Sequence, residues 1–281
     1  MIALFLLAIV GPVLIGLAFS ALYSLGAIGL LSSGWTLKYW RAALTDTETW
    51  VALGYSAYIA LVSVTVSAAL ALTVVVMLGE RVRRGGLGYL LYVPLAIPAT
   101  VAGLLSFEIF GNAGLLSRIA HALGLTSVPA DFPNLLFDRA GFGIILTHLA
   151  MITPFLVIFF DRLGRSEYLD ALNQLAATLG ASRTQNLCRV TVPVMLRRAA
   201  PTLSLYGIFL LSAFEVPLLI GAQYPPMISV LIQRRFDLFD IATKPEAYAL
   251  ATLYGIVILA GLLIAFRRRD ASGRQDAEAY T

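Results

Sequence analysis

The chain has 281 residues, of which 59% are hydrophobic and 13% are charged, and its mean hydropathy is +0.85. Soluble domains carry about 25% charged residues, so the composition excludes an ordinary soluble protein and predicts one that crosses a membrane several times. The net charge of +4 does not indicate a nucleic-acid partner, because the basic residues stand in short clusters between apolar runs, as anionic lipid headgroups select.

The first apolar run, Met1 to Leu37, contains no charged side chain. It has no basic stretch at its start and is longer than the apolar region of a signal peptide, so we expect a membrane helix rather than a cleaved leader. The run begins almost inside the expected helix, which leaves open whether the natural chain starts further upstream.

Six apolar runs in all approach or exceed the roughly 20 residues that a bilayer span needs. They are too long and too uniformly apolar for barrel strands, and backbone groups in lipid must be paired, so we expect helices. The sequence predicts an all-α membrane protein with a single transmembrane domain over 1–281. Its six transmembrane helices are expected at about 2–28, 53–78, 88–110, 141–161, 202–221 and 248–266.

The distribution of arginine and lysine predicts the orientation. Most of the basic residues lie in 79–87, in 162–200 and after 266, which the positive-inside rule places in the cytoplasm. An even number of spans then places both termini in the cytoplasm.

The longest cytoplasmic loop, 162–200, is polar but has a helical pattern. Leu172, Leu175, Ala176 and Leu179 recur at i, i+3, i+4 and i+7, as on one face of an amphipathic helix, and Gly180 follows as a stop. Periodicity alone leaves two roles open for this helix: docking in the groove of a partner, or lying on the lipid surface.

A second apolar stripe in the loop includes Leu187, Val190 and Val194. Pro193 is expected to disturb the backbone before the fifth span begins. We therefore expect two short helices in the loop, one on each side of Gly180 and Ala181.

The loop resembles the EAA loop of ABC-importer permeases, a pattern of Glu-Ala-Ala, three residues, Gly, nine residues, an aliphatic residue, any residue, an aliphatic residue and Pro. Gln174 stands where the family has its glutamate; it keeps the hydrogen-bonding ability but loses the charge. Leu175 replaces the first alanine and extends the apolar stripe, so docking is expected to depend more on packing. The positions that agree are Ala176, Gly180, Val190, Val192 and Pro193, and Leu179 and Ala181 belong to a family-like "LGAS".

The resemblance implies that this loop forms a coupling helix, seated in a groove of a cytoplasmic ATPase subunit, within the type I importer fold. The segment "GERVRRGG" (79–86) has the wrong spacing for a phosphate-binding loop, so ATP and Mg are expected on another chain, with no cofactor in this one. The implied partners are two cytoplasmic ABC ATPase subunits, a second permease chain that is identical or homologous, an external solute-binding protein and membrane lipid. The implied location is the bacterial plasma (inner) membrane.

Three further segments resemble permeases of the polyamine and thiamine branch: 34–56, 91–105 and 213–222. This resemblance extends over nearly the whole chain and favours a small polar or cationic solute. Iron or an organic anion stays open as an alternative.

Ionisable residues inside a membrane are costly, so Glu108, His148 and Glu215 are candidates for the translocation path. A cationic solute entering from outside could meet both carboxylates. Interfacial solvation or helix–helix hydrogen bonds are the alternative roles, and a structural role is the commoner one for a histidine. His121, His148 and Cys188 are too few and too dispersed for a metal site.

Two other functions remain open from the sequence alone. An ion-gradient-driven secondary transporter would use Glu108 and Glu215 as its intramembrane acids, although no internal repeat is evident. A membrane enzyme would need a nucleophile and a base, and no such set appears.

Overall fold

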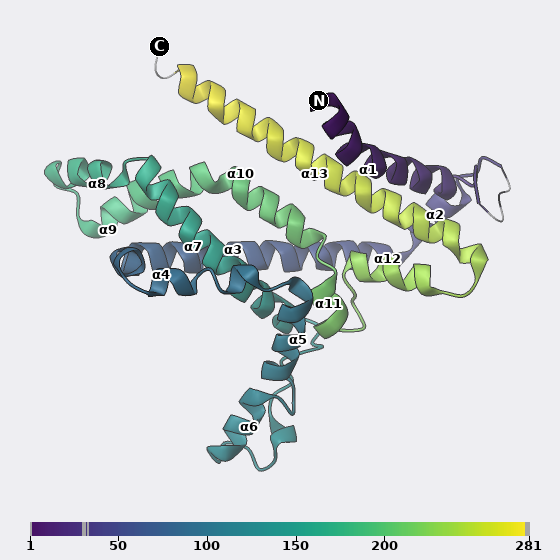
Figure 1. Ribbon diagram of the computed structural model, residues 1–281, viewed down its shortest axis with the longest axis horizontal. Coiled ribbons are helices and arrows are strands. Elements are labelled where there is room, and N and C mark those ends of the chain that lie inside the picture. Colours follow the sequence, from purple (N-terminus) through teal and green to yellow (C-terminus); the bar gives the residue numbers. More distant parts are fainter. Residues whose placement is uncertain (1, 30–31, 33, 279–281) are drawn as a thin grey trace. The chain divides into compact units, whose positions relative to one another are not determined.

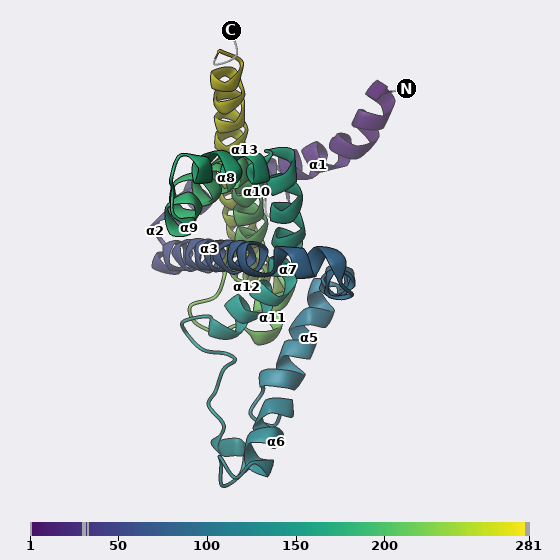
Figure 2. The same cartoon turned by 90° about the vertical axis from the view of Figure 1, so that its left-hand side faces the viewer.

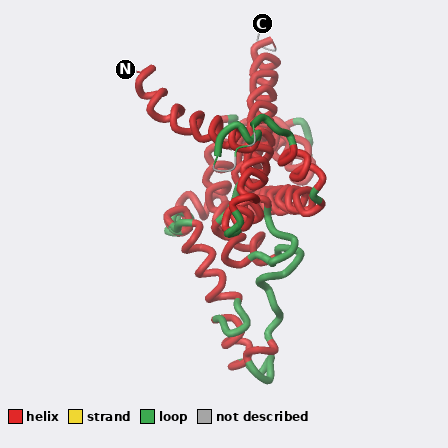
Figure 3. Tube along the Cα trace, turned by 90° about the vertical axis from the view of Figure 1, so that its right-hand side faces the viewer, coloured by secondary structure: helices red, strands yellow, loops and turns green. Residues whose placement is uncertain are grey.

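The computed structural model describes residues 2–29, 32 and 34–278, and within these residues all regular structure is helical (Figures 1 and 3). The all-α class predicted from the sequence is confirmed. The chain divides into two compact units, of which the first comprises 1–57 and 223–264 and the second 58–222 and 265–281.

Five helices among the described residues are long and apolar enough to cross a membrane, and Val10–Ser24 is a shorter apolar helix. The multi-pass character predicted from the composition is therefore confirmed, while the count of six spans and the orientation stay predictions. The five are Thr47–Gly79, Ala99–Ala122, Phe142–Ser166, Arg183–Leu211 and Ile241–Arg267.

The first unit holds α1 (Ile2–Ser24), α2 (Lys38–Thr45), the start of α3 (Thr47–Arg84), α12 (Ile228–Asp237), a 3₁₀ turn (Ile241–Thr243) and most of α13 (Lys244–Glu278). Its core contains Ala52 of α3, Ile228 and Leu231 of α12 and Leu250 of α13, all almost fully buried. The Ser56 Oγ accepts a hydrogen bond of 2.8 Å from the backbone N–H of Ile228, which fixes the start of α12 against α3.

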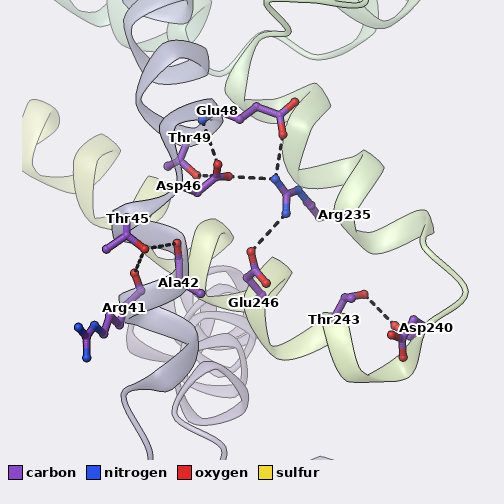
Figure 4. Close-up of polar contacts among 10 residues, drawn as sticks. All are labelled: Arg41, Ala42, Thr45, Asp46, Glu48, Thr49, Arg235, Asp240, Thr243 and Glu246. Atoms are coloured by element: carbon purple, nitrogen blue, oxygen red, sulfur yellow. Dashed lines mark hydrogen bonds and ion pairs between the residues drawn. The ribbon is translucent and has the colours of Figure 1, made fainter.

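A single arginine joins three helix ends in this unit (Figure 4). The Arg235 guanidinium, in the last turn of α12, donates to Asp46 (2.9 Å) and Glu48 (2.8 Å) at the start of α3 and to Glu246 (3.2 Å) at the start of α13. The arginine lies at a helix C-terminus and the carboxylates at helix N-termini, where the helix dipoles favour a positive and a negative charge respectively. The network excludes much water, because the four side chains are only 27–34% exposed.

The second unit is built around α7 (Phe142–Ser166). Small residues of α3, such as Ala60 and Ala71, allow close packing against Leu156 and Phe160 of α7, and Met195 and Leu210 of α10 (Val192–Leu211) complete the core. The remaining elements are α4 (Leu87–Leu90), a 3₁₀ turn (Pro94–Ala96), α5 (Ala99–Phe110), α6 (Leu115–Ala122), a 3₁₀ turn (Pro129–Asp131), α8 (Leu169–Thr178), α9 (Arg183–Asn186), a π-helical turn (Leu187–Thr191) and α11 (Glu215–Ile220). Figure 2 shows α5 leading toward α6, away from α7.

The expected helix over 88–110 is wrong as a single element. A 3₁₀ turn at Pro94–Ala96 interrupts it, and α5 begins only after Pro98. Proline lacks the N–H of a helical ladder and forces the preceding residue into extended backbone, as at Ile97, where φ is −87° and ψ is 120°.

The expected helix over 202–221 is also wrong as a single element. The helix α10 begins at Val192, inside the segment assigned to the loop, and ends at Leu211; α11 begins at Glu215. Pro217 explains the break, because its ring would clash with the carbonyl of Ala213 if the helix ran through it. The Ser212 hydroxyl donates to the Phe209 carbonyl (2.8 Å) and supports the end of α10.

Candidate functional site

The first helix of the 162–200 loop, α8, ends in a Schellman motif centred on Gly180. The backbone N–H of Gly180 donates to Ala177 (3.0 Å) and that of Ala181 donates to Ala176 (3.0 Å). Gly180 has φ +83°, a left-handed conformation that glycine adopts without strain. The spacing of Ala176, Gly180 and Ala181 in the loop therefore has a local structural reason: it ends the helix and turns the chain.

The second part of the loop begins with a capping box. The backbone N–H of Gln185 donates to the Ser182 hydroxyl (3.3 Å), and the Gln185 Oε1 accepts from the backbone N–H of Ser182 (3.0 Å). These two bonds satisfy backbone donors at the start of α9 that have no partner in the helix. The polar run Ser182–Asn186 thus serves to start a helix directly after the turn.

Asn173 ties the two parts of the loop together. Its side-chain Oδ1 accepts a hydrogen bond of 3.0 Å from the Thr191 hydroxyl, and its backbone carbonyl accepts one of 3.2 Å from the Asn186 Nδ2. These contacts fix α8 to α9 and to the π-helical turn. The two expected short helices are present, and they form one hairpin.

A salt bridge fastens the base of this hairpin to α10. The Arg198 Nε donates to the Glu167 Oε2 at 3.2 Å, with the two side chains 40% and 28% exposed. Glu167 follows the last residue of α7 as its C-cap, two residues before α8 begins. The pair therefore joins the start of the loop to the helix that follows it.

Pro193 disturbs the backbone without ending the helix. It lies in the first turn of α10, and the preceding turn, Leu187–Thr191, is π-helical, with the Val192 N–H bonded to the Leu187 carbonyl. The wider turn adjusts the ladder around the missing N–H of the proline. Helical backbone consequently runs from Arg183 to Leu211.

The helix α8 has two faces of different character. Leu169 is buried in the core, and Asn173 and Ala176 are partly buried, so these three form the inward face. Leu172, Leu175 and Leu179 are 38%, 59% and 80% exposed and form the outward face. The single stripe predicted from the sequence is divided, since Ala176 belongs to the inward face. Gln174 is also exposed, but the helical repeat places it away from the outward leucines.

The other positions of the pattern, Val190, Val192 and Pro193, lie in the π-helical turn and the start of α10. Val190 and Val192 are partly buried and Pro193 is exposed. They shape the return of the loop and do not extend the outward face of α8.

Two of the three candidate path residues, Glu108 and Glu215, lie on the neighbouring helices α5 and α11. Gly103 of α5 approaches Val216 and Leu219 of α11, and farther along α5 Phe107 packs against Phe137, whose N–H bonds to the Ile220 carbonyl. The two helices are therefore parallel, with Glu215 toward the start of α5 and Glu108 toward its end.

Both of these carboxylates are exposed in the isolated chain, whereas His148 of α7 is 3% exposed. The His148 Nδ1 is buried and has no hydrogen-bond partner among the described residues. The role of all three in translocation stays a prediction.

Sequence analysis missed the contacts that give the loop its shape. The capping box has a recognisable Ser-x-x-Gln signal at Ser182 and Gln185, which the sequence could have provided. The contacts of Asn173 and the Glu167–Arg198 pair join residues far apart along the chain, and no local pattern predicts them.

No family model matches the chain. The Putrescine transport system permease protein PotI of Escherichia coli K12 is 27% identical over 255 residues, which are 86% of this chain and 81% of PotI. The Molybdenum transport system permease protein ModB of Mycobacterium bovis is 31% identical over 107 residues, 38% of this chain and 36% of ModB. A probable sulfate transport system permease protein, cysT of Anthoceros angustus, is 25% identical over 179 residues, 61% of this chain and 56% of cysT.

The same fold occurs in a crystal structure of a bacterial alginate ABC transporter in complex with its alginate pentasaccharide-bound periplasmic protein. One of its chains matches with a TM-score of 0.65 at 18% identity, over 97% of this chain and 91% of that one. These relatives are permease proteins of transport systems rather than enzymes, and the chain is similar to one of them over most of its length and has the fold of an ABC transporter chain.

Proposed function

We propose that the chain forms the translocation path of an ABC importer and couples it, through 162–200, to a separate cytoplasmic ATPase subunit. The observation that carries this proposal is the outward face of α8. Leu172, Leu175 and Leu179 are exposed on a helix whose end, turn and return are all fixed by hydrogen bonds. An exposed apolar helical face on a rigid support fits the groove of a partner.

The proposed topology has six spans with both termini in the cytoplasm, as in the type I importer fold. Val10–Ser24 within α1 is apolar and, with the residues before it, would supply the sixth span beside the five longer helices. The arginine-rich segments then lie in the cytoplasm of a bacterial inner membrane. The whole chain would act as one transmembrane permease domain.

The proposed assembly contains a second permease chain, two ATPase subunits that bind ATP and Mg, and an external solute-binding protein. Closing of the ATPase subunits would pull the coupling loops together and open the helices outward. The similarity to PotI supports a small polar solute of the polyamine type. The names of the molybdenum and sulfate relatives keep small anions as the competing class.

The test of coupling is Gly180→Pro in the reconstituted transporter. Proline cannot adopt φ +83° and lacks the N–H that bonds to Ala177, so the turn after α8 should be lost. We expect ATP hydrolysis to continue with little transport, while the chain remains in the membrane. Transport and ATP hydrolysis are measured in the same proteoliposomes.

The matched control is Gly124→Pro. Gly124 ends α6 in the same motif, with φ +71° and N–H bonds from Gly124 to His121 (2.9 Å) and from Leu125 to Ala120 (2.9 Å). The two substitutions disturb the same kind of turn, but α6 is outside the coupling loop. Full coupling in Gly180→Pro, or equal uncoupling in both variants, would sink the proposal.

A further inference from the structure

A cavity with mainly apolar walls lies in the second unit between α7, α10 and the last part of α13. Its volume is about 300 Å³. Arg198 is the one charged residue in its lining. The apolar lining residues include Phe159, Leu163, Pro201, Leu205 and Phe266.

A second apolar cavity continues this one along α10. It has a volume of about 310 Å³ and is lined by Leu205, Tyr206 and Phe209, so Leu205 borders both cavities. Arg198, Leu205 and Phe209 are spaced i, i+7 and i+11, which places them on one face of α10. From Arg198 to Phe209 the helix rises about 16 Å, roughly the thickness of the hydrocarbon in one leaflet.

The charge at the Arg198 end is positive. Arg197 and Arg267 are exposed and adjoin the lining residues Arg198 and Phe266, and Arg198 pairs with Glu167 at 3.2 Å. Three arginines gathered at one end of the groove favour an anionic headgroup, and guanidinium groups suit phosphate oxygens. A second copy of this chain, seated here face to face, would bring its own arginines to the same place and be repelled.

We propose that an anionic phospholipid of the cytoplasmic leaflet binds at this groove. Its phosphate lies at Arg197, Arg198 and Arg267, and one acyl chain follows α10 past Leu205 to Phe209. The site depends on the cytoplasmic placement of 162–200, but not on coupling to an ATPase. Because Arg198 also holds Glu167, the bound headgroup lies beside the junction of α7 and α8.

The test is a lipid titration of the purified full chain, with any subunits that accompany it, counted by native mass spectrometry. After delipidation, phosphatidylglycerol and phosphatidylcholine with the same acyl chains are added in turn. We expect tighter retention of phosphatidylglycerol, and about fivefold weaker retention for each of Arg198→Gln and Arg267→Gln. Leu205→Trp, which fills the groove without changing the charge, should also release the lipid.

The matched controls are Arg189→Gln and Leu196→Trp. Both residues are exposed, and neither lines the groove. Thermal unfolding in phosphatidylcholine verifies that each variant is folded. If Arg198→Gln does not fold, Arg267→Gln alone tests the contribution of the arginines to lipid retention. Equal retention of the two lipids would overturn the proposal. Two results for Leu205→Trp would also overturn it. One is unchanged retention of phosphatidylglycerol, and the other is a loss of pairing between permease chains while the lipid stays bound.

Discussion

Two residues of the 162–200 loop, Gln174 and Leu175, depart from the EAA pattern, and the structure places both on the outside. Gln174 and Leu175 are exposed on α8, so neither is required by the packing of the loop itself. Their neighbours Ala176 and Gly180, which agree with the pattern, instead form the Schellman turn. The spacing that agrees with the pattern thus preserves the shape of the loop, and the departures alter only its exposed surface.

Leu175→Ala should weaken ATPase association even though it restores the family residue. Leu175 is 59% exposed, and burying it against a partner is expected to contribute about 1–2 kcal/mol, roughly tenfold in affinity. The measurement is the affinity of the purified ATPase subunit for the permease in detergent. Leu125→Ala, a 74% exposed leucine after α6, is the control. Unchanged or tighter binding of Leu175→Ala would contradict docking by packing.

At the scale of elements, the break between α10 and α11 determines how the second unit packs. Because Pro217 ends the continuous helix, α11 can lie along α5. The approach is close at Gly103, where an added Cβ would lie 2.9 Å from the Leu219 Cδ1 and 3.7 Å from the Val216 Cα. A residue without a side chain is therefore needed at this crossing.

Gly103→Val should destabilise the chain by about 1–3 kcal/mol, because its methyl groups cannot fit between α5 and α11. Thermal unfolding in detergent is the measurement. Gly207→Val, at a helical glycine of α10 with nothing within 4 Å of an added Cβ, controls for helix propensity. Equal stability losses in the two variants would show that the crossing is not tight.

The sequence predicted the elements that depend on local or periodic signals. The apolar runs located the membrane helices, and Gly180 located the end of α8. The sequence did not predict the breaks before α5 and before α11, although Pro98 and Pro217 are visible in it. A proline in a membrane helix either kinks the helix or ends it, depending on what packs beside it. The network of Arg235 joins residues almost two hundred positions apart, such as Asp46, and no local signal could indicate it.

At the scale of the whole molecule, the chain folds into two units that are each assembled from distant segments. The first unit combines 1–57 with 223–264, so contacts between the two ends of the chain must form before it is stable. Arg235 provides one such contact, since it holds the starts of α3 and α13 to the end of α12. Its loss leaves three carboxylates close together.

Arg235→Ala should lower the stability of the chain by about 1–2 kcal/mol, discounted for the partial exposure of the network. The salt dependence gives the sharper test. In the natural chain, added salt screens the attraction between Arg235 and the three carboxylates. In the variant, it screens the repulsion among Asp46, Glu48 and Glu246, so added salt should stabilise only the variant. Thermal unfolding at low and high salt measures this. Arg234→Ala, which loses a bond to the Gln223 carbonyl, should behave as the natural chain does.

The π-helical turn at Leu187–Thr191 sets the angular phase between the loop and α10. A π turn holds one residue more than an α turn, and each residue of an α-helix corresponds to a rotation of about 100°. Deleting one residue there would restore a regular helix and swing α9, with the α8 hairpin attached to it, about a quarter turn around the axis of α10. The outward leucines would then point in a new direction. The Asn186–Asn173 hydrogen bond within the hairpin would remain, whereas the bond from Thr191 at the end of the turn to Asn173 would be lost.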